Sequence, residues 1–284
     1  MIELIELTNR VAHTELVERF GTKGCIIAVD FYVSGAEDWS EMPWGFRSGN
    51  VLNVDHHAPV VEMQRPVSSG NLATLLLRDR PTMHGLSAQP NIQVKINHLD
   101  CDSVISAGLL SGLIRPEKRW EEAVLEADHF GGENEIADAL QALEQERDYD
   151  LSFAVLKCLD EGLKLPARAE ELLEKRMQER KNLAKIANAA EIIGQVALVR
   201  QRCELAGCLP ALLPQAKVIV CVNQRGEDRW TMKLRLGNSS EKTLQQLVDF
   251  DENYGGRWNA GSNKRGGGTT ITPEAYCQLI DDRL

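Results

Sequence analysis

The stretch IQVKINHLDCDSVISAGLLSGLI (92–114) indicates the architecture of the first half of the chain. Residues 92–100 contain an alternating, largely apolar run that is typical of a strand. Residues 103–114 predict a helix that follows almost at once. A strand that runs directly into a helix is the repeating unit of a parallel sheet. Acidic and imidazole groups are gathered at the junction between the two elements, so this junction is also a candidate functional position.

The residues before this stretch repeat the same pattern. The apolar runs CIIAVDF (25–31) and NVLNVDHH (50–57) predict two further strands, and residues 9–20 and 70–80 predict helices. Residues 34–49 are interpreted as a polar loop. This alternation predicts an α/β fold with a doubly wound, mostly parallel sheet.

The second half of the chain has a different texture. A long charged helix is predicted over residues 166–191, with Pro166 at its start. It either connects two domains or packs along the flank of one. Beyond it, strands are expected at 196–201, 217–224 and 229–236, then a helix at 241–250 and a glycine-rich loop at 255–270. We therefore expect a metal-binding catalytic domain over residues 1–165, a connecting helix over 166–191, and a smaller α+β substrate-binding domain over 192–284.

Composition narrows the class of protein. No apolar run reaches the length of a membrane span, and the first residues lack the pattern of a secretory signal. The 7 cysteines are scattered without a framework, which favours reduced thiols and a cytoplasmic location. Cys203 and Cys208 lack the second pair that a zinc site requires. The net charge of −10 disfavours binding to long duplex DNA but permits a small anionic substrate in a local basic pocket.

Acidic and imidazole residues recur where the predicted elements end. Parallel strands direct their carboxyl ends to one crevice, so clusters that are distant in sequence can meet there. Crowded carboxylates repel one another unless protons or cations neutralise them. Mixed oxygen and imidazole ligands suit Mn²⁺, with Mg²⁺, Co²⁺ or Fe²⁺ as alternatives, and the number of ligands suggests two ions. We expect four clusters, each at the end of a predicted element: Asp30, Asp55-His56-His57, His98 with Asp100 and Asp102, and Asp128-His129.

Each cluster alone has a plainer interpretation. A single aspartate after a strand, such as Asp30, commonly caps a helix or a turn. The pair Asp100 and Asp102 could suggest a calcium loop, but the glycine and the closing glutamate of such a loop are missing. The metal-site interpretation therefore depends on all four clusters coming together.

The motifs resemble those of a known family. Val54-Asp55-His56-His57 resembles the signature of the DHH phosphoesterase superfamily, which includes RecJ-type exonucleases, oligoribonucleases, cyclic-dinucleotide phosphodiesterases and manganese pyrophosphatases. His98-x-Asp100-x-Asp102-Ser103 is similar to that family's other main metal motif. Residues 255–261 resemble the glycine-rich substrate loop of the associated DHHA1 domain.

The resemblance implies a role for each motif residue. His98 and Asp100 would hold one metal ion, and Asp102, His56 and Asp128 the other, with Asp30 bridging the two. Asp55 would orient an imidazole, and His57 would face the phosphate, while water activated by the two metals attacks phosphorus. The resemblance of residues 255–261 implies Gly255, Gly256, Arg257 and Asn259 as substrate residues, and the charges of the same loop add Lys264 and Arg265.

The sequence departs from the family at two points. The His-x-Asp-x-Asp motif normally precedes the lone aspartate and the Asp-His-His motif, whereas here it follows both. A permuted strand order could still bring the same ligands together. Arg257 also stands where the family usually has a histidine after its glycines, which bears on substrate preference.

The glycine-rich loop also has physical features of an anion site. Clustered glycines let backbone N–H groups approach an anion closely. Arg257, Lys264 and Arg265 add positive charge, and Trp258 offers a surface on which a base can stack. The alternative is a flexible surface loop with incidental cations.

These features predict a metal-dependent phosphoesterase that cleaves a small phosphorylated substrate, preferably a nucleotide or a short oligonucleotide. Two alternatives remain open: a phosphoanhydride hydrolase of the pyrophosphatase or polyphosphatase kind, and a non-catalytic nucleotide-binding or assembly module. We expect no membrane partner, and the sequence leaves a homodimer open.

Overall fold

The protein is described from a computed structural model, which covers residues 2–5, 11–21, 24–35, 38–57, 66–79, 92–203 and 205–284. The chain divides into two compact units, Met1–Asp128 with Glu133–Lys175, and His129–Gly132 with Arg176–Leu284. The division falls inside helix α7 (Ala167–Asn188), which contributes to both units. The domain boundaries and roles expected from the sequence stay predictions.

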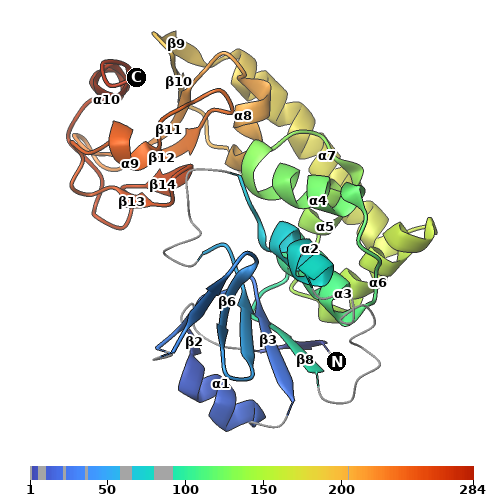
Figure 1. Cartoon of the computed structure of the whole chain (residues 1–284). Coiled ribbons are helices and arrows are strands. Elements are labelled where there is room, and N and C mark those ends of the chain that lie inside the picture. Colours follow the sequence, from blue (N-terminus) through green and yellow to red (C-terminus); the bar gives the residue numbers. More distant parts are fainter. Residues whose placement is uncertain are drawn as a thin grey trace. The chain divides into compact units, whose positions relative to one another are not determined.

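The first unit contains a six-stranded mixed sheet (Figure 1). Neighbouring strands are parallel from β1 through β8 and β3 to β7, and antiparallel from β7 through β6 to β5. The expected strands at 25–31, 50–57 and 92–100 are present in shorter form, and the mixed α/β content is as predicted. The doubly wound arrangement stays a prediction. In sheet order the strands are β1 (Ile2–Leu4), β8 (Ile92–Ile96), β3 (Cys25–Val29), β7 (Val51–Val54), β6 (Gly45–Ser48) and β5 (Ser40–Met42).

Two local predictions for this unit are wrong. The segment interpreted as a polar loop contains the hairpin of β5 and β6, whose turn includes the fully buried Trp44. A β-carbon at Gly45 would lie 2.1 Å from the carbonyl oxygen of Asn53, so only glycine fits against the neighbouring strand. The helix expected from residue 9 begins at His13, because Val11 and Ala12 form β2 and pair with β4 (Val33–Ser34). Residues 9 and 10 lie outside the described residues.

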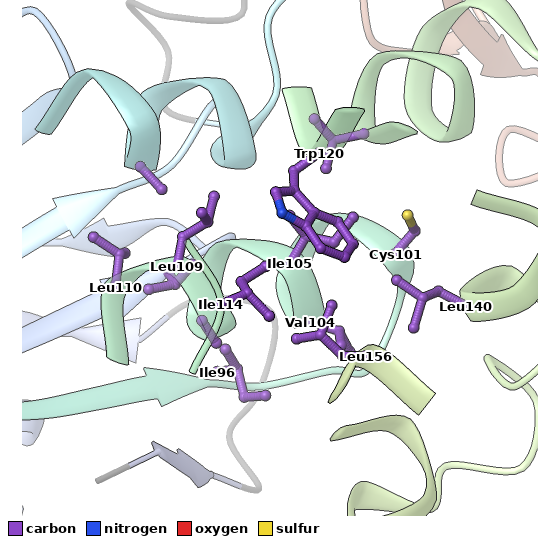
Figure 2. Close-up of a cluster of buried hydrophobic side chains, with 14 of the residues drawn as sticks. Ile96, Cys101, Val104, Ile105, Leu109, Leu110, Ile114, Trp120, Leu140 and Leu156 are labelled. Atoms are coloured by element: carbon purple, nitrogen blue, oxygen red, sulfur yellow. The ribbon is translucent and has the colours of Figure 1, made fainter. Parts of the chain in front are cut away.

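Apolar helices build the core of the first unit (Figure 2). All residues of α3 (Cys101–Ser111) are buried. Val104, Ile105 and Leu109 of this helix belong to the same buried cluster as Trp120. Because α3 begins at Cys101, inside the acidic motif of residues 98–102, this packing fixes the position of the motif. The other helices are α1 (His13–Phe20), α2 (Ser69–Asp79), α4 (Lys118–Leu125), α5 (Glu135–Gln141) and α6 (Tyr149–Glu161).

The second unit also has a six-stranded sheet, in the order β13-β14-β12-β11-β10-β9. Only β10 and β11 pair in parallel within this sheet as described. The predicted strands at 196–201, 217–224 and 229–236 are confirmed. The strands are β9 (Glu191–Ile193), β10 (Val196–Val199), β11 (Val218–Gln224), β12 (Trp230–Leu236), β13 (Gly255–Gly256) and β14 (Ala260–Ser262).

Three features of this unit differ from the prediction. The expected helix at 241–250 is reduced to α9 (Leu244–Leu247). The segment expected as a glycine-rich loop contains the hairpin of β13 and β14, in which Gly256 of β13 lies directly against Gly261 of β14. Helix α10 (Pro273–Asp281), with Thr272 as its N-cap, was not expected. A short helix, α8 (Leu209–Leu212), precedes β11. Among the described residues, no helix has the length and apolarity that crossing a membrane requires.

Candidate metal centre

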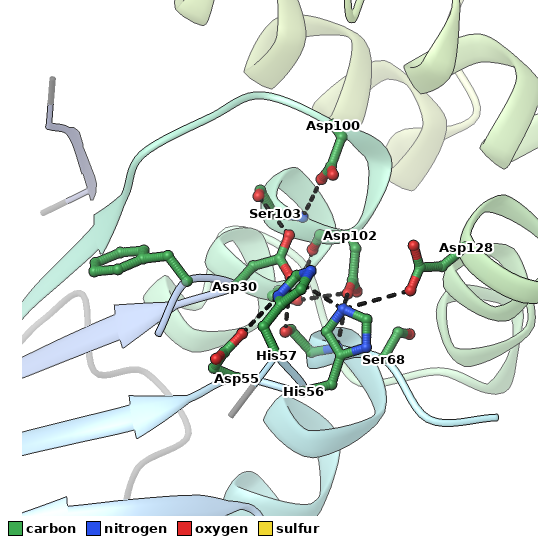
Figure 3. A network of polar contacts seen from close by, with 12 residues as sticks. Asp30, Asp55, His56, His57, Ser68, Asp100, Asp102, Ser103 and Asp128 are labelled. Carbon is green, nitrogen blue, oxygen red and sulfur yellow. Dashed lines mark hydrogen bonds and ion pairs between the residues drawn. The ribbon is translucent and has the colours of Figure 1, made fainter. Parts of the chain in front are cut away.

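Three motifs lie at the ends of three adjacent parallel strands (Figure 3). Asp30 follows β3, which lies between β8 and β7. Residues 98–102 follow β8, and Asp55-His56-His57 follow β7. Spatial order therefore differs from chain order, and the permuted position of the His-x-Asp-x-Asp motif does not prevent the motifs from meeting.

The fourth cluster does not follow a strand. Asp128 belongs to a π-helical turn (Glu126–Phe130) that continues α4, so the expectation of a strand end is wrong for this residue. The turn still brings Asp128 Oδ2 to 3.4 Å from His56 Nε2. The helical pattern of residues 118–125 is the signal that could have predicted this origin.

Asp30 is at the centre of the cluster and is 1% exposed. Its backbone is in the left-handed region, with φ of 60°, and its N–H donates to Val54 O at 3.0 Å. Ser69 Oγ donates to Asp30 Oδ1 at 3.0 Å, and Ser103 Oγ donates to Asp30 Oδ2 at 2.7 Å. His56 Nε2 lies 3.5 Å from Oδ1, and His98 Nε2 lies 3.1 Å from Oδ2. His57 Nδ1 also lies 3.6 Å from Oδ1, so Oδ1 meets one hydroxyl and two imidazoles, and Oδ2 meets one hydroxyl and one imidazole.

Asp102 is the second buried carboxylate of the cluster. Its Oδ2 accepts from Ser69 N at 2.7 Å, and its Oδ1 accepts from Gly70 N at 2.8 Å. These are the first two N–H groups of α2, so Asp102 satisfies donors that a helix start leaves without partners. His56 Nε2 lies 3.8 Å from Asp102 Oδ2. A β-carbon at Gly70 would lie 2.8 Å from Val124 Cγ1, so glycine at this position permits α2 to lie close to Val124 of α4.

Asp100 contacts both α3 and an imidazole. Its Oδ1 accepts from Ser103 N at 2.9 Å and so caps α3, while its Oδ2 lies 3.1 Å from His98 Nε2. Asp30, His98 and Asp100 have ligand atoms within 4.8 Å of one another, and so do Asp30, His56 and His57. Two neighbouring groups of possible metal ligands therefore share one carboxylate.

Asp55 and His57 form a further pair at the same edge, next to Asp30. His57 Nδ1 lies 2.8 Å from Asp55 Oδ1, and Asp55 is fully buried. In the described part of the chain, Asp55 Oδ2 has no hydrogen-bond partner. The side chain of His57 is 32% exposed, so this imidazole is accessible from solvent while its other end is held.

The carboxylates draw protons onto the imidazoles. Burial alone lowers the pKa of His56, but Asp128 and Asp30 outweigh it and raise that pKa to about 10. Burial likewise lowers the pKa of His98, and Asp100 and Asp30 together raise it to about 12. These raised pKa values favour the protonated form of both imidazoles at neutral pH.

The two buried carboxylates respond in opposite directions. Burial raises the pKa of Asp30, but hydrogen bonds from His56 and His98 hold it well below its ordinary value. Burial and the charge of Asp30 raise the pKa of Asp102 well above its ordinary value. The cluster thus accommodates its negative charge only with the help of protons, which divalent cations could replace. The donor set of carboxylate oxygens and imidazole nitrogens fits such cations.

The predicted substrate residues lie in the second unit. Gly255 and Gly256 form β13 and are exposed, and a β-carbon at Gly256 would lie 2.3 Å from Gly261 Cα. Asn259 is 8% exposed, and its Nδ2 lies 3.0 Å from His129 Nδ1. This part of the loop is therefore a paired hairpin, whereas the alternative interpretation of the sequence was a flexible surface loop. Arg257 is half-buried in this hairpin, and Lys264 and Arg265 are exposed just beyond β14.

The sequence pointed to Ser69, Gly70 and Ser103 only as parts of a helix start and a motif. In the structure they donate hydrogen bonds to the carboxylates. Small polar residues at the first turns of two otherwise apolar helices are the signal that could have identified them.

No family profile matches the sequence, and no curated protein sequence matches it. Similar solved structures include the pGpG-specific phosphodiesterase PggH from Vibrio cholerae, with 14% identity and a TM-score of 0.47 over 84% of this chain and 82% of that chain. The exonuclease RecJ bound to manganese has 14% identity and a TM-score of 0.41 over 96% of this chain and 78% of that chain. An exopolyphosphatase-related protein from Bacteroides fragilis has 11% identity and a TM-score of 0.38 over 95% of this chain and 94% of that chain.

These three proteins belong to the DHH/DHHA1 superfamily. The chain resembles the DHH/DHHA1 phosphoesterase superfamily in its motifs.

Proposed function

We propose that the chain is a divalent-metal-dependent phosphoesterase that hydrolyses a nucleotide or a short oligonucleotide. One observation carries the proposal: buried carboxylates and imidazoles from three adjacent parallel strands converge on Asp30. Such a cluster is costly to a fold unless cations occupy it, so its retention favours a metal function.

The ligand atoms divide into two sets around Asp30. Asp30 Oδ2 faces His98, which also contacts Asp100, and Asp30 Oδ1 faces His56, which also contacts Asp128. Bound divalent cations, for which we propose Mn²⁺, would lower the pKa of water and stabilise charge on the phosphoryl oxygens. In the proposed arrangement, one ion is held by His98, Asp100 and Asp30, and the other by Asp102, His56, Asp128 and Asp30.

Asp55 and His57 have a proposed role toward the substrate. Asp55 Oδ1 holds His57 Nδ1, and in the proposed role Nε2 of the same ring would donate to a phosphate or leaving-group oxygen. Burial lowers the pKa of His57, whereas the hydrogen bond to Asp55 and the charge of Asp30 raise it, with a net rise. This rise favours the protonated imidazole, the form in which Nε2 can donate.

The second unit has a proposed role in substrate binding. The exposed glycines of β13 offer backbone N–H groups, and Arg257, Lys264 and Arg265 offer charge for a phosphate. Trp258 offers an aromatic surface for a base. A nucleotide substrate would use both the phosphate-binding groups and the aromatic surface, whereas inorganic pyrophosphate would use only the phosphate-binding groups.

A substrate panel with Mn²⁺ tests the proposal. The panel contains pGpG, short single-stranded oligonucleotides, pyrophosphate and polyphosphate, and product release is compared between the wild type and Asp100→Asn. Asparagine can still cap α3, so the variant removes the ligand charge and keeps the helix start. We expect the wild type to cleave a nucleotide substrate and the variant to lose that activity.

Other results would replace the proposal. Cleavage of pyrophosphate or polyphosphate alone would assign a phosphoanhydride hydrolase. Nucleotide binding without turnover, together with no tight Mn²⁺ binding, would assign a non-catalytic module.

A further inference from the structure

Two buried serines contact the central aspartate of the metal centre. Ser69 Oγ donates to Asp30 Oδ1 at 3.0 Å. Ser103 Oγ donates to Asp30 Oδ2 at 2.7 Å (Figure 3). Both serines are fully buried. Because an ionised carboxylate has no proton, each hydroxyl must be the donor. The carboxylate is therefore held at both oxygens and cannot rotate freely.

Each serine also contacts a second carboxylate through its backbone. Ser69 N donates to Asp102 Oδ2 at 2.7 Å, and Ser103 N donates to Asp100 Oδ1 at 2.9 Å. A single residue thus connects Asp30 to Asp102, and another connects Asp30 to Asp100. These two outer carboxylates belong to different proposed metal positions, so each serine sets the spacing between carboxylates of one position.

The same division holds at the imidazoles. The oxygen that accepts from Ser69 is the one that faces His56, and the oxygen that accepts from Ser103 is the one that faces His98. A carboxylate oxygen has two lone-pair positions, so a hydroxyl on one leaves the other for a cation.

We propose that Ser69 and Ser103 are positioning residues that present one oxygen of Asp30 to each of two metal positions. The inference rests on the proposed metal-dependent function. Ser69 serves the position of His56, Asp102 and Asp128. Ser103 serves the position of His98 and Asp100. Neither serine is itself a ligand.

Mn²⁺ titration of the full chain by calorimetry tests the assignment. The variants are Ser69→Ala and Ser103→Ala, and Ser111→Ala is the matched control, since Ser111 is a buried serine of α3 whose hydroxyl donates to Gly108 O. Loss of a hydrogen bond to a metal ligand typically weakens metal affinity by about 10- to 100-fold. We expect a loss of that size in one binding event for each serine variant and a change below about twofold for Ser111→Ala.

A second background separates the two positions. In Asp100→Asn, which weakens the position of His98, Ser69→Ala should still weaken the remaining Mn²⁺ binding, whereas Ser103→Ala should change it little. Far-UV circular dichroism checks that each variant is folded. If an alanine variant unfolds, Ser69→Cys and Ser103→Cys keep the volume with a weaker donor and should show the same losses.

The outcomes are distinguishable from failure of the proposed function. If the wild type binds two Mn²⁺ and either serine variant binds both with unchanged affinity, the positioning role is wrong while the phosphoesterase proposal stands. If the wild type binds no Mn²⁺, both are overturned.

Discussion

Two buried aspartates, one in each unit, are stabilised by different kinds of neighbours. Asp30 lies among imidazoles whose pKa values are raised and close to a second carboxylate. Asp251, which is 7% exposed, accepts from Asn263 Nδ2 at 2.9 Å, from Tyr276 OH at 2.8 Å and from Asn253 N at 3.1 Å. These three donors are neutral and carry no exchangeable charge.

The difference separates a structural carboxylate from a candidate ligand. Asp251 is satisfied by groups that belong permanently to the fold, and they fix the segment around Asn263, whose Oδ1 also accepts from Met232 N at 2.8 Å. Asp30 depends on protons that a cation can displace. Burial alone therefore does not identify a functional carboxylate, whereas the charge state of its neighbours does.

The largest effect is expected for Asp30→Asn. The change removes the charge shared by both proposed metal positions, while asparagine keeps the shape and tolerates a left-handed backbone. Activity with Mn²⁺ should fall by at least about 10³-fold, because residues that act as a unit fail together. Steady-state kinetics and metal analysis of the purified protein measure it. Activity within tenfold of the wild type would contradict the central role of Asp30.

A stability effect is expected for Asp251→Ala. Truncation leaves Asn263 Nδ2 and the Tyr276 hydroxyl buried without an acceptor, which should lower the free energy of unfolding by about 2–4 kcal/mol. Urea denaturation measures the loss. The Mn²⁺ affinity of the folded protein should stay unchanged. A loss of Mn²⁺ affinity in this variant would contradict the purely structural role of Asp251.

A smaller loss is expected for Tyr276→Phe. The side chain is fully buried, and the change removes one donor while Asn263 and the backbone N–H of Asn253 still contact Asp251. We expect the free energy of unfolding to fall by about 1.5 kcal/mol, measured by urea denaturation. A loss as large as that of Asp251→Ala would mean that the tyrosine alone stabilises the network.

The smallest effect is expected at an exposed carboxylate. Its own backbone N–H and then Arg200 lower the pKa of Glu274, whose side chain is 53% exposed. Because the folded pKa lies below the unfolded value, the contribution is present above the unfolded pKa and is lost as the pH falls through the folded pKa. Solvent screening limits it, so Glu274→Gln should cost less than about 0.5 kcal/mol at pH 7 and less still at about pH 3. Urea denaturation at both pH values checks this, and a loss above 1 kcal/mol would contradict it.

The sequence predicted the strands of the candidate site because each is a short apolar run that ends in an acidic residue. It also predicted which ligand types would gather there, since the carboxyl ends of parallel strands meet. It did not predict the hairpin at 40–48, because pairing with β7 stabilises that segment and its own residues alone do not indicate a strand. The Asp251 network was also missed, since Asn263 and Tyr276 are distant in sequence and form no motif.

The backbone of Asp30 has one further consequence. Its φ of 60° lies in a region that costs a residue with a side chain about 1 kcal/mol or more, and that glycine adopts freely. A glycine would relieve this strain and also remove a buried carboxylate, yet the chain has aspartate at the position. The aspartate therefore lowers local stability at the residue on which the proposed chemistry would depend. Selection for stability alone would be expected to replace this aspartate.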